Sequence, residues 1–345
     1  MSSADRGRRG RRLVAAIAFG LGVVLLVAGG LTTIARSVPF SWVPIATDDW
    51  AMATSFTDFG IVAYALSLVC LGVAVIVRAS RLRVVVGVLA LGLAVLHASW
   101  IVPWFIADSV RPDPTTPVFR ILALNMGLGR ADPAVVVGAA NSVDVVVLTE
   151  ATKPAHQALL VAGLGDRFPY EQQGGYLPVS GAGGTTVFSR FPIIATTALP
   201  AGIAHQNWLV RIDVPGTGAV ALAAVHPTRP FAGGNDWLKE QNMLHAAVVG
   251  AQPDVVAGDF NAVDNHLPIR RLSADGFRST TDSAGSGWQP TYPADRTHLP
   301  PLAPIDHILI SPGLAAAESH TVRIPGTDHL GVVATIGRVV PRAEG

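Results

Sequence analysis

Three long apolar segments in the first third of the chain constrain its fold more than any other feature. They run from Leu13 to Ile34, from Ile61 to Val77 and from Val84 to Ile106, and none contains Asp, Glu, Lys or Arg. Each is close to the roughly 20 residues that a helix needs to cross a bilayer. The sequence therefore predicts a cytoplasmic N-terminus and three transmembrane helices within residues 1–107.

The first apolar segment follows RGRRGRR, which is also how a cleaved signal peptide begins. The segment is long, and no small-x-small cleavage site precedes a soluble stretch before the next one, so we favour an uncleaved anchor. Basic residues precede the first segment and lie between the second and third, at Arg6, Arg8, Arg9, Arg11, Arg12, Arg78, Arg81 and Arg83. Because such residues mark the cytoplasmic side, we expect a multi-pass cell-membrane protein whose later residues are extracytoplasmic.

The remainder of the chain is long enough for one further domain. The only cysteine, Cys70, lies in the second apolar segment, so no disulfide can stabilise that domain. Residues 108–116, where prolines cluster, are expected to form a linker, and residues 117–340 the domain itself.

From Phe119 onward the sequence changes to short β-rich runs separated by a few helix candidates. The runs are FRILALN, VDVVVLTE, TTVFS, NWLVRIDV, AVALAAVH, DVVAGDF, IDHILIS and HLGVVATI. Helices are expected to start at Asp132-Pro133, to span about 236–249, and to lie near 268–274. Several strands are apolar throughout, which indicates sheets covered by helices.

Polar side chains stand where these apolar runs end or begin. In VVAGDFNA, residues 255–262, alternation along a strand would place Asp259 and Asn261 on one face. A strand that ends in G-D-x-N is also often only a turn whose side chains bond their own backbone. Other runs end or begin with Asn125, Glu150, His226, Asp306, His307, Asp328 and His329. So many positions on separate strands favour a shared site for a cation or a phosphate.

The motifs LALNMG, VVLTEA, TTVFSRFPI, AVHPTRP, GDFNA, IDHIL and TDHLGV follow one another in this order. In them the sequence resembles the endonuclease/exonuclease/phosphatase superfamily, which shares its fold with pancreatic deoxyribonuclease, sphingomyelinases and inositol polyphosphate phosphatases. The resemblance covers about residues 117–339. It implies an α/β fold of the DNase I-like kind, a two-sheet sandwich of four layers, with the site at one edge where loops from both sheets meet.

The resemblance also implies a cofactor, Mg²⁺ or Mn²⁺. Glu150, assisted by the amide of Asn125, matches the family's metal ligands, and Asp328 would complete the acidic cluster. These are hard oxygen donors of the kind that such cations prefer.

Roles in catalysis are implied for five further residues. Asp259 and Asn261 resemble the pair that places the attacking water and binds a phosphate oxygen. His226 and His329 resemble the two histidines that contact the phosphate and assist proton transfer, and Asp306 would fix the tautomer of His329.

The remaining histidines are predicted to lie outside the site. No family motif contains His205, His245, His266 or His320, which we expect on the surface or in the core. His307 alternates away from Asp306 and is expected to be structural.

Charge bears on the choice of substrate. From residue 108 onward there are 16 Lys and Arg against 20 Asp and Glu, a balance of −4. Proteins that grip long nucleic acids usually carry a basic stripe, and none is evident here. The favoured hypothesis is a membrane-anchored phosphodiesterase for lipid, glycolipid or small phosphodiester substrates. The alternatives are a surface endonuclease or exonuclease on nucleic acid, and a non-catalytic module that binds a phosphorylated ligand.

Overall fold

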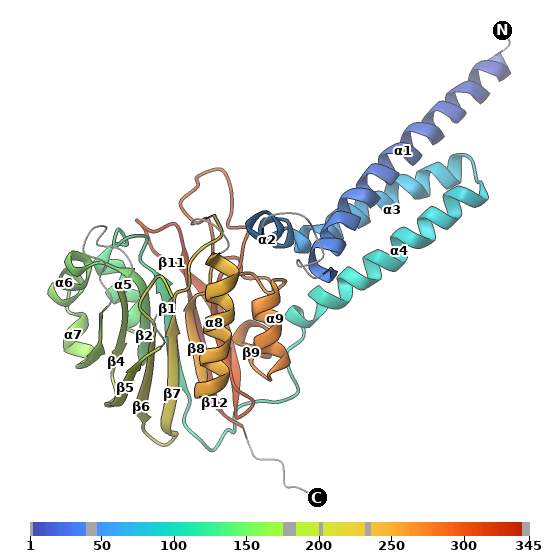
Figure 1. Ribbon diagram of the computed structural model, residues 1–345. Helices are drawn as coiled ribbons and strands as arrows, with labels where there is room; N and C mark the ends of the chain where they lie inside the picture. Colours follow the sequence, from blue (N-terminus) through green and yellow to red (C-terminus); the bar gives the residue numbers. More distant parts are fainter. Residues whose placement is uncertain (1–2, 39–46, 175–183, 200–202, 232–235, 340–345) are drawn as a thin grey trace, which may run out of the picture. The chain divides into compact units, whose positions relative to one another are not determined.

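The computed structural model describes residues 3–38, 47–174, 184–199, 203–231 and 236–339 (Figure 1). The chain divides into two compact units, Met1–Pro103 and Trp104–Gly345.

The first unit is helical. It contains α1 (Ser3–Ser37), α2 (Thr47–Ser55), the short 3-10 helix η2 (Thr57–Phe59), α3 (Gly60–Val77) and α4 (Arg81–Ile101). Among the described residues, three helical segments are long and apolar enough to cross a membrane: Asp5–Ser37, Thr57–Val77 and Arg81–Phe105. The first two contain the predicted segments, and the third contains its predicted segment except for Ile106. Helix α4 ends at Ile101, five residues before the end of the third predicted segment, and the 3-10 helix η3 (Val102–Phe105) follows. Pro103 explains this end, because its ring disfavours a continuing α-helix.

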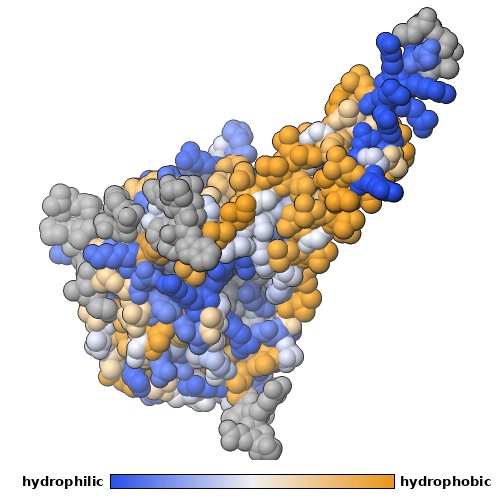
Figure 2. All heavy atoms as spheres, turned by 45° about the vertical axis from the view of Figure 1, so that its right-hand side comes forward, coloured by the Kyte–Doolittle hydropathy of each residue, from blue (hydrophilic) through white to orange (hydrophobic). Residues whose placement is uncertain are grey.

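The long helices of the first unit expose apolar side chains over most of their length, as the orange surface in Figure 2 shows, whereas one end is hydrophilic (blue). Ile17, Val69, Ile76 and Val85 are each more than 60% exposed, with Ile76 at 84%. In water such a surface would be costly, whereas acyl chains would cover it.

Polar contacts join the three long helices internally. The hydroxyl of Thr33 on α1 lies 2.6 Å from the Tyr64 hydroxyl on α3 and 2.8 Å from Nε2 of His97 on α4. Tyr64 and His97 are fully buried. Polar side chains within bundles of apolar helices are commonly paired in this way, by hydrogen bonds to a neighbouring helix.

The described part of the second unit contains two six-stranded sheets. The first has the order β11-β12-β1-β2-β4-β3, and the second β5-β6-β7-β8-β10-β9. In the first sheet the strands are β1 (Phe119–Asn125), β2 (Val145–Ala151), β3 (Tyr170–Gln172), β4 (Gly184–Ser189), β11 (Leu314–Arg323) and β12 (Leu330–Arg338). In the second they are β5 (Ile193–Ala198), β6 (Trp208–Val214), β7 (Gly218–Val225), β8 (Val255–Asp259), β9 (Arg278–Ser279) and β10 (Asp306–Ile310). The pairs β1/β2 and β7/β8 are parallel, and the others are antiparallel.

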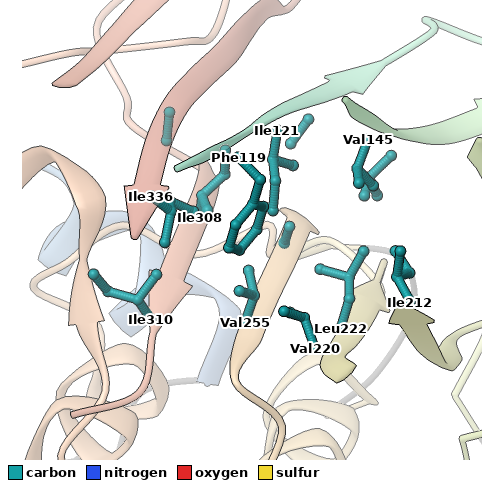
Figure 3. Packing of buried hydrophobic residues seen from close by; sticks show 14 of the residues in the cluster. Phe119, Ile121, Val145, Ile212, Val220, Leu222, Val255, Ile308, Ile310 and Ile336 are labelled. Carbon is teal, nitrogen blue, oxygen red and sulfur yellow. The ribbon is translucent and has the colours of Figure 1, made fainter. Parts of the chain in front are cut away.

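The two sheets pack face to face around an apolar core (Figure 3). Phe119 and Ile121 of β1 belong to the same buried cluster as Leu222 of β7, Val255 of β8 and Ile308 of β10. Strands buried on both faces account for the continuous apolar runs in the sequence.

Helices cover the outer faces of both sheets (Figure 1). On the first sheet they are α5 (Pro133–Ala140), α6 (Lys153–Val161) and α7 (Leu164–Arg167), which pack through a second buried cluster that includes Leu122, Val136 and Leu159. On the second sheet they are α8 (Asp236–Ala251) and α9 (Leu267–Ala274), and the short α10 (Thr280–Ala284) leads towards β10. The predicted α/β sandwich of four layers is therefore confirmed.

Residues 108–116, expected to form a linker, belong to the second unit and are hydrogen-bonded within it. The backbone N–H of Asp108 donates to the carbonyl of Ser283 at 3.1 Å, and that of Asp113 donates to the carbonyl of Arg338 at 2.7 Å. Pro112 also bridges to Val339. This segment is thus attached to the end of β12, while the start of the domain at residue 117 stays a prediction.

Candidate active site

Strand register gathers the polar strand ends at one edge of the sandwich. In the first sheet Asn125 lies opposite Thr149, so Glu150 follows at the same edge. In the second sheet Asp306, the first residue of β10, pairs with Asp259, the last residue of β8. Each sheet thus brings two polar strand ends side by side at this edge.

Asp259 lies at the centre of the arrangement and is 2% exposed. Its Oδ2 accepts a hydrogen bond from Nδ2 of Asn125 at 2.9 Å, across the two sheets. The same oxygen lies 3.8 Å from Nε2 of His226 and 4.0 Å from Nε2 of His329. One carboxylate therefore faces an amide and two imidazoles.

His329 is held by Asp306. Its Nδ1 lies 2.8 Å from Oδ2 of Asp306, and its backbone N–H donates to the Thr327 hydroxyl at 3.1 Å. The Thr327 hydroxyl in turn donates to the carbonyl of Asn125 at 2.8 Å, which ties this loop to β1. A carboxylate on Nδ1 fixes the tautomer and directs Nε2 towards Asp259.

Burial and charge separate the protonation states of the three central groups. Burial, reinforced by the neighbouring Asp306, raises the pKa of Asp259 to about 7. Burial alone would lower the pKa of His329, but the charge and hydrogen bond of Asp306 outweigh it and raise that pKa to about 10. The pKa of His226 lies well below its ordinary value because of burial, and then because of two neighbouring imidazoles. Near pH 7 the site thus holds one imidazolium and one neutral imidazole.

Alternation along a strand predicted that Asp259 and Asn261 lie on one face, and this prediction was wrong. Strand β8 ends at Asp259, and Asn261 has a left-handed backbone with φ of 48°. Its backbone N–H donates to Oδ1 of Asp259 at 2.8 Å, and its Nδ2 donates to the carbonyl of Pro227 at 3.0 Å. The alternative interpretation of GDFN, a turn in which the aspartate side chain bonds its own backbone, thus describes this segment correctly. Asn is one of the few residues that adopt this conformation readily.

Glycine is required just before this turn. A Cβ on Gly258, whose φ is 144°, would lie 2.1 Å from the carbonyl oxygen of Val225. The close approach of β7 and β8 therefore needs glycine here.

The loop after β1 contacts all three predicted metal ligands. The backbone N–H groups of Gly127 and Leu128 donate to Oδ1 of Asn125 at 2.8 Å and to Oε2 of Glu150 at 2.7 Å. Arg130, further along the same loop, pairs with Asp328, its guanidinium nitrogen lying 3.4 Å from Oδ1. Glu150 and Leu128 both have positive φ, 52° and 59°, which is uncommon for such residues and typical of functional sites.

Two sets of side chains bear on a cation: one whose ligand atoms the structure brings together, and the predicted set of Asn125, Glu150 and Asp328, which stays a prediction. Among the described residues, Asp259, Asp306 and His329 have ligand atoms within 4.8 Å of one another. Within this set, Oδ2 of Asp306 and Nδ1 of His329 already bond each other. The three predicted ligands offer carboxylate and amide oxygens alone, which fits a hard cation such as Mg²⁺.

The structure places two further aromatic side chains at the site, and the prediction that one of them, His205, lies outside it was wrong. The ring of His205 stacks on that of His226, with centroids 4.0 Å apart and planes at 9°. Tyr292 lies against His329, with centroids 5.0 Å apart. His205 precedes β6, and the antiparallel pairing of β6 with β7 brings it beside His226. Only that hairpin register could have indicated it from the sequence.

The other histidines have roles outside this arrangement. His307 bonds the carbonyl of Ala262 through Nε2 at 2.7 Å, as a structural residue would. His245 pairs with Asp275 at 2.6 Å. Nδ1 of His266 accepts from the backbone N–H of Val263 at 3.0 Å, and the side chain of His320 is 49% exposed.

Comparison with known proteins identifies the family of this chain. Residues 120–329 match the model of the Endonuclease/Exonuclease/phosphatase family, and the chain belongs to that family. Its members are hydrolases of phosphoester bonds, in general with a divalent metal.

Solved structures show the same fold at low sequence identity. An endonuclease/exonuclease/phosphatase from Bacteroides vulgatus matches with a TM-score of 0.52 and 15% identity over 64% of this chain and 99% of that one. A family protein from Leptotrichia buccalis matches with a TM-score of 0.50 and 15% identity over 63% and 99%. A conserved protein of unknown function from Enterococcus faecalis matches with a TM-score of 0.51 and 14% identity over 64% and 99%. No match was found among curated proteins.

Proposed function

We propose that this protein is a membrane-anchored, metal-dependent phosphodiesterase that cleaves lipid, glycolipid or other small phosphodiesters on the extracytoplasmic side. The observation that carries the proposal is the buried carboxylate of Asp259, placed between the amide of Asn125 and the Nε2 atoms of His226 and His329. Such a set can deprotonate a water and stabilise a phosphate at the same point.

Asp259 is the proton acceptor in this proposal. Its pKa of about 7 lets a substantial fraction of the carboxylate be ionised near neutral pH while keeping the group basic enough to take a proton from the attacking water. The amide of Asn261, in the turn that Asp259 caps, binds a non-bridging phosphate oxygen.

The two histidines have different roles, because one is protonated and the other is neutral. His329, protonated through its bond to Asp306, donates a hydrogen bond to a phosphate oxygen and can protonate the leaving oxygen. His226, which is neutral, contacts the phosphate from the other side of Asp259. No covalent nucleophile is needed, because phosphoryl transfer depends mainly on positioning and charge stabilisation.

Asn125, Glu150 and Asp328 would hold the Mg²⁺ or Mn²⁺ ion. When bound, that ion neutralises charge on the phosphate oxygens and offsets the repulsion between the buried carboxylates. The loop of Gly127 and Leu128, which bonds two of the three ligands, keeps them oriented.

Charge and anchoring support a small or lipid-linked substrate. The balance of 16 basic against 20 acidic residues after residue 107 gives no general attraction for a polyanion. Tethering by apolar helices would raise the effective concentration of a substrate in the same bilayer. The arginines that flank the apolar segments support an extracytoplasmic site.

The test is a comparison of substrates and salt. Purified full-length protein in detergent, with Mg²⁺, is given a phosphodiester lipid in mixed micelles, a short soluble phosphodiester, and plasmid DNA. We expect better turnover of the first two and a shallow dependence on salt. Binding of duplex DNA would instead weaken by roughly 0.9 log units per tenfold salt for each phosphate neutralised. Efficient degradation of plasmid at about 150 mM salt without action on the small or lipid substrates would make the protein a surface nuclease.

A further inference from the structure

His226 differs from the other imidazole of the site in how its ring is held. Nδ1 of His226 is buried and has no hydrogen-bond partner among the described residues. Its Nε2 lies 3.8 Å from Oδ2 of Asp259, which is beyond hydrogen-bond distance. His329, by contrast, has the carboxylate of Asp306 on Nδ1. Some other contact must therefore fix the plane of the His226 ring.

The ring of His205 makes that contact. It lies parallel to His226, with a centroid distance of 4.0 Å and an interplanar angle of 9°. Burial lowers the pKa of both imidazoles, so near pH 7 two neutral rings stack without charge repulsion.

A single buried amide fixes the two backbones to each other. Oδ1 of Asn207 accepts from the backbone N–H of His226 at 2.5 Å, and its Nδ2 donates to the carbonyl of His205 at 2.7 Å. Asn207 is 2% exposed. The ring of His205 is thus attached to a rigid point and not to a free loop.

The geometry points to His205 as a positioning residue of the active site, which holds the ring of His226 with Nε2 directed at Asp259 and at the phosphate bound there. The inference rests on the proposed function, because that proposal assigns His226 to the phosphate. His205 acts through the face of its ring, so an aromatic ring without nitrogen should replace it. Residues that orient a group of this kind typically change activity by about 10- to 100-fold when removed.

The experiment compares two variants of the full-length protein with the wild type and with His320→Ala, which removes an exposed imidazole. Turnover of the short phosphodiester is expected to fall about 10- to 100-fold in His205→Ala, mainly in kcat, and to stay within about threefold of wild type in His205→Phe. His320→Ala should match the wild type. Thermal unfolding of each variant shows whether the fold is retained. If His205→Phe is as impaired as His205→Ala, the nitrogen atoms matter and the inference is overturned.

Crystal structures of the same variants separate failure of this inference from failure of the proposed function. The His226 ring should leave its wild-type plane, or occupy two, in His205→Ala and should keep it in His205→Phe. An unchanged ring in His205→Ala would overturn the inference even if no substrate were turned over. Absence of turnover in the wild type would instead refute the proposed function.

Discussion

Replacing Asp259 with asparagine removes the buried charge around which the site is organised. The pKa of this carboxyl is raised from 3.8 to about 7 by burial and by Asp306. Between these values the folded chain holds a proton that the unfolded chain has released, so the stability falls as the pH rises through this window. Above pH 7 the folded chain bears the full cost of ionising the buried Asp259 carboxyl. Asparagine, which does not ionise, should relieve this cost.

The penalty is on the order of 4 kcal/mol, at about 1.4 kcal/mol for each pH unit between the two pKa values. Asparagine has its own cost. The two oxygens of Asp259 accept hydrogen bonds from Nδ2 of Asn125 and from the backbone N–H of Asn261, and an amide can serve only one of these donors. An unmatched buried donor costs about 1 to 3 kcal/mol. The net gain in stability at pH 8 should be roughly 1 to 3 kcal/mol, or about 2 to 4 °C per kcal/mol in melting temperature.

The assay is thermal unfolding of full-length protein in detergent with EDTA, at pH 8 and at pH 5. Asp259→Asn should melt above the wild type at pH 8 and differ little from it at pH 5, where most of the penalty is absent. Asp213→Asn, which changes an exposed carboxylate on β6, is the matched control and should change neither value. A variant that melts below the wild type at pH 8, or a difference that does not depend on pH, would refute the reasoning.

Three further predictions address the other groups and the topology. Glu150→Gln keeps the shape of the side chain but removes a charge that the cation needs, so turnover should fall 10²-fold or more; wild-type turnover at saturating Mg²⁺ would exclude this role. Asp306→Asn removes the carboxylate that raises the pKa of His329, so an NMR titration should find that pKa well below about 10, with turnover reduced 10²- to 10⁴-fold; an unchanged titration would contradict the pairing. Protease added to intact spheroplasts should release a fragment of about the size of the second unit, whereas protection until lysis would place the site in the cytoplasm.

Much of the fold could be predicted because strongly patterned segments determine it. Uncharged runs of sufficient length predicted the apolar helices, and short runs of Val, Ile and Leu predicted most strands. The strands that were missed, β3, β5, β9 and β11, lie at the edges of the two sheets. The first and third are only three and two residues long, β5 reads IIATTA and is largely exposed, and β11 reads LAAAESHTVR and carries a bulge near Ala316. Edge strands such as these are specified by their neighbours more than by their own sequence.

The site could be predicted as a set of residues but not as a geometry. The structure gathers Asn125, His226, Asp259, Asp306 and His329 around one carboxylate oxygen and its hydrogen-bond partners. That Asn261 would leave the extended conformation is not visible in an alternating pattern, because a single positive φ reverses the direction of the side chain. The stacking of His205 on His226 depends on a hairpin register that no local motif encodes.

The most direct test of the account is hydrolysis of bis(4-nitrophenyl) phosphate by the purified full-length protein. Turnover is measured with Mg²⁺, with Mn²⁺ and with EDTA, and again with Glu150→Gln. The account predicts turnover that requires the metal, is abolished by EDTA, and falls 10²-fold or more in the variant. Turnover that survives both EDTA and Glu150→Gln, or its absence with every phosphodiester and phosphomonoester tried in the presence of metal, would contradict the claim that this site is a metal-dependent phosphoesterase.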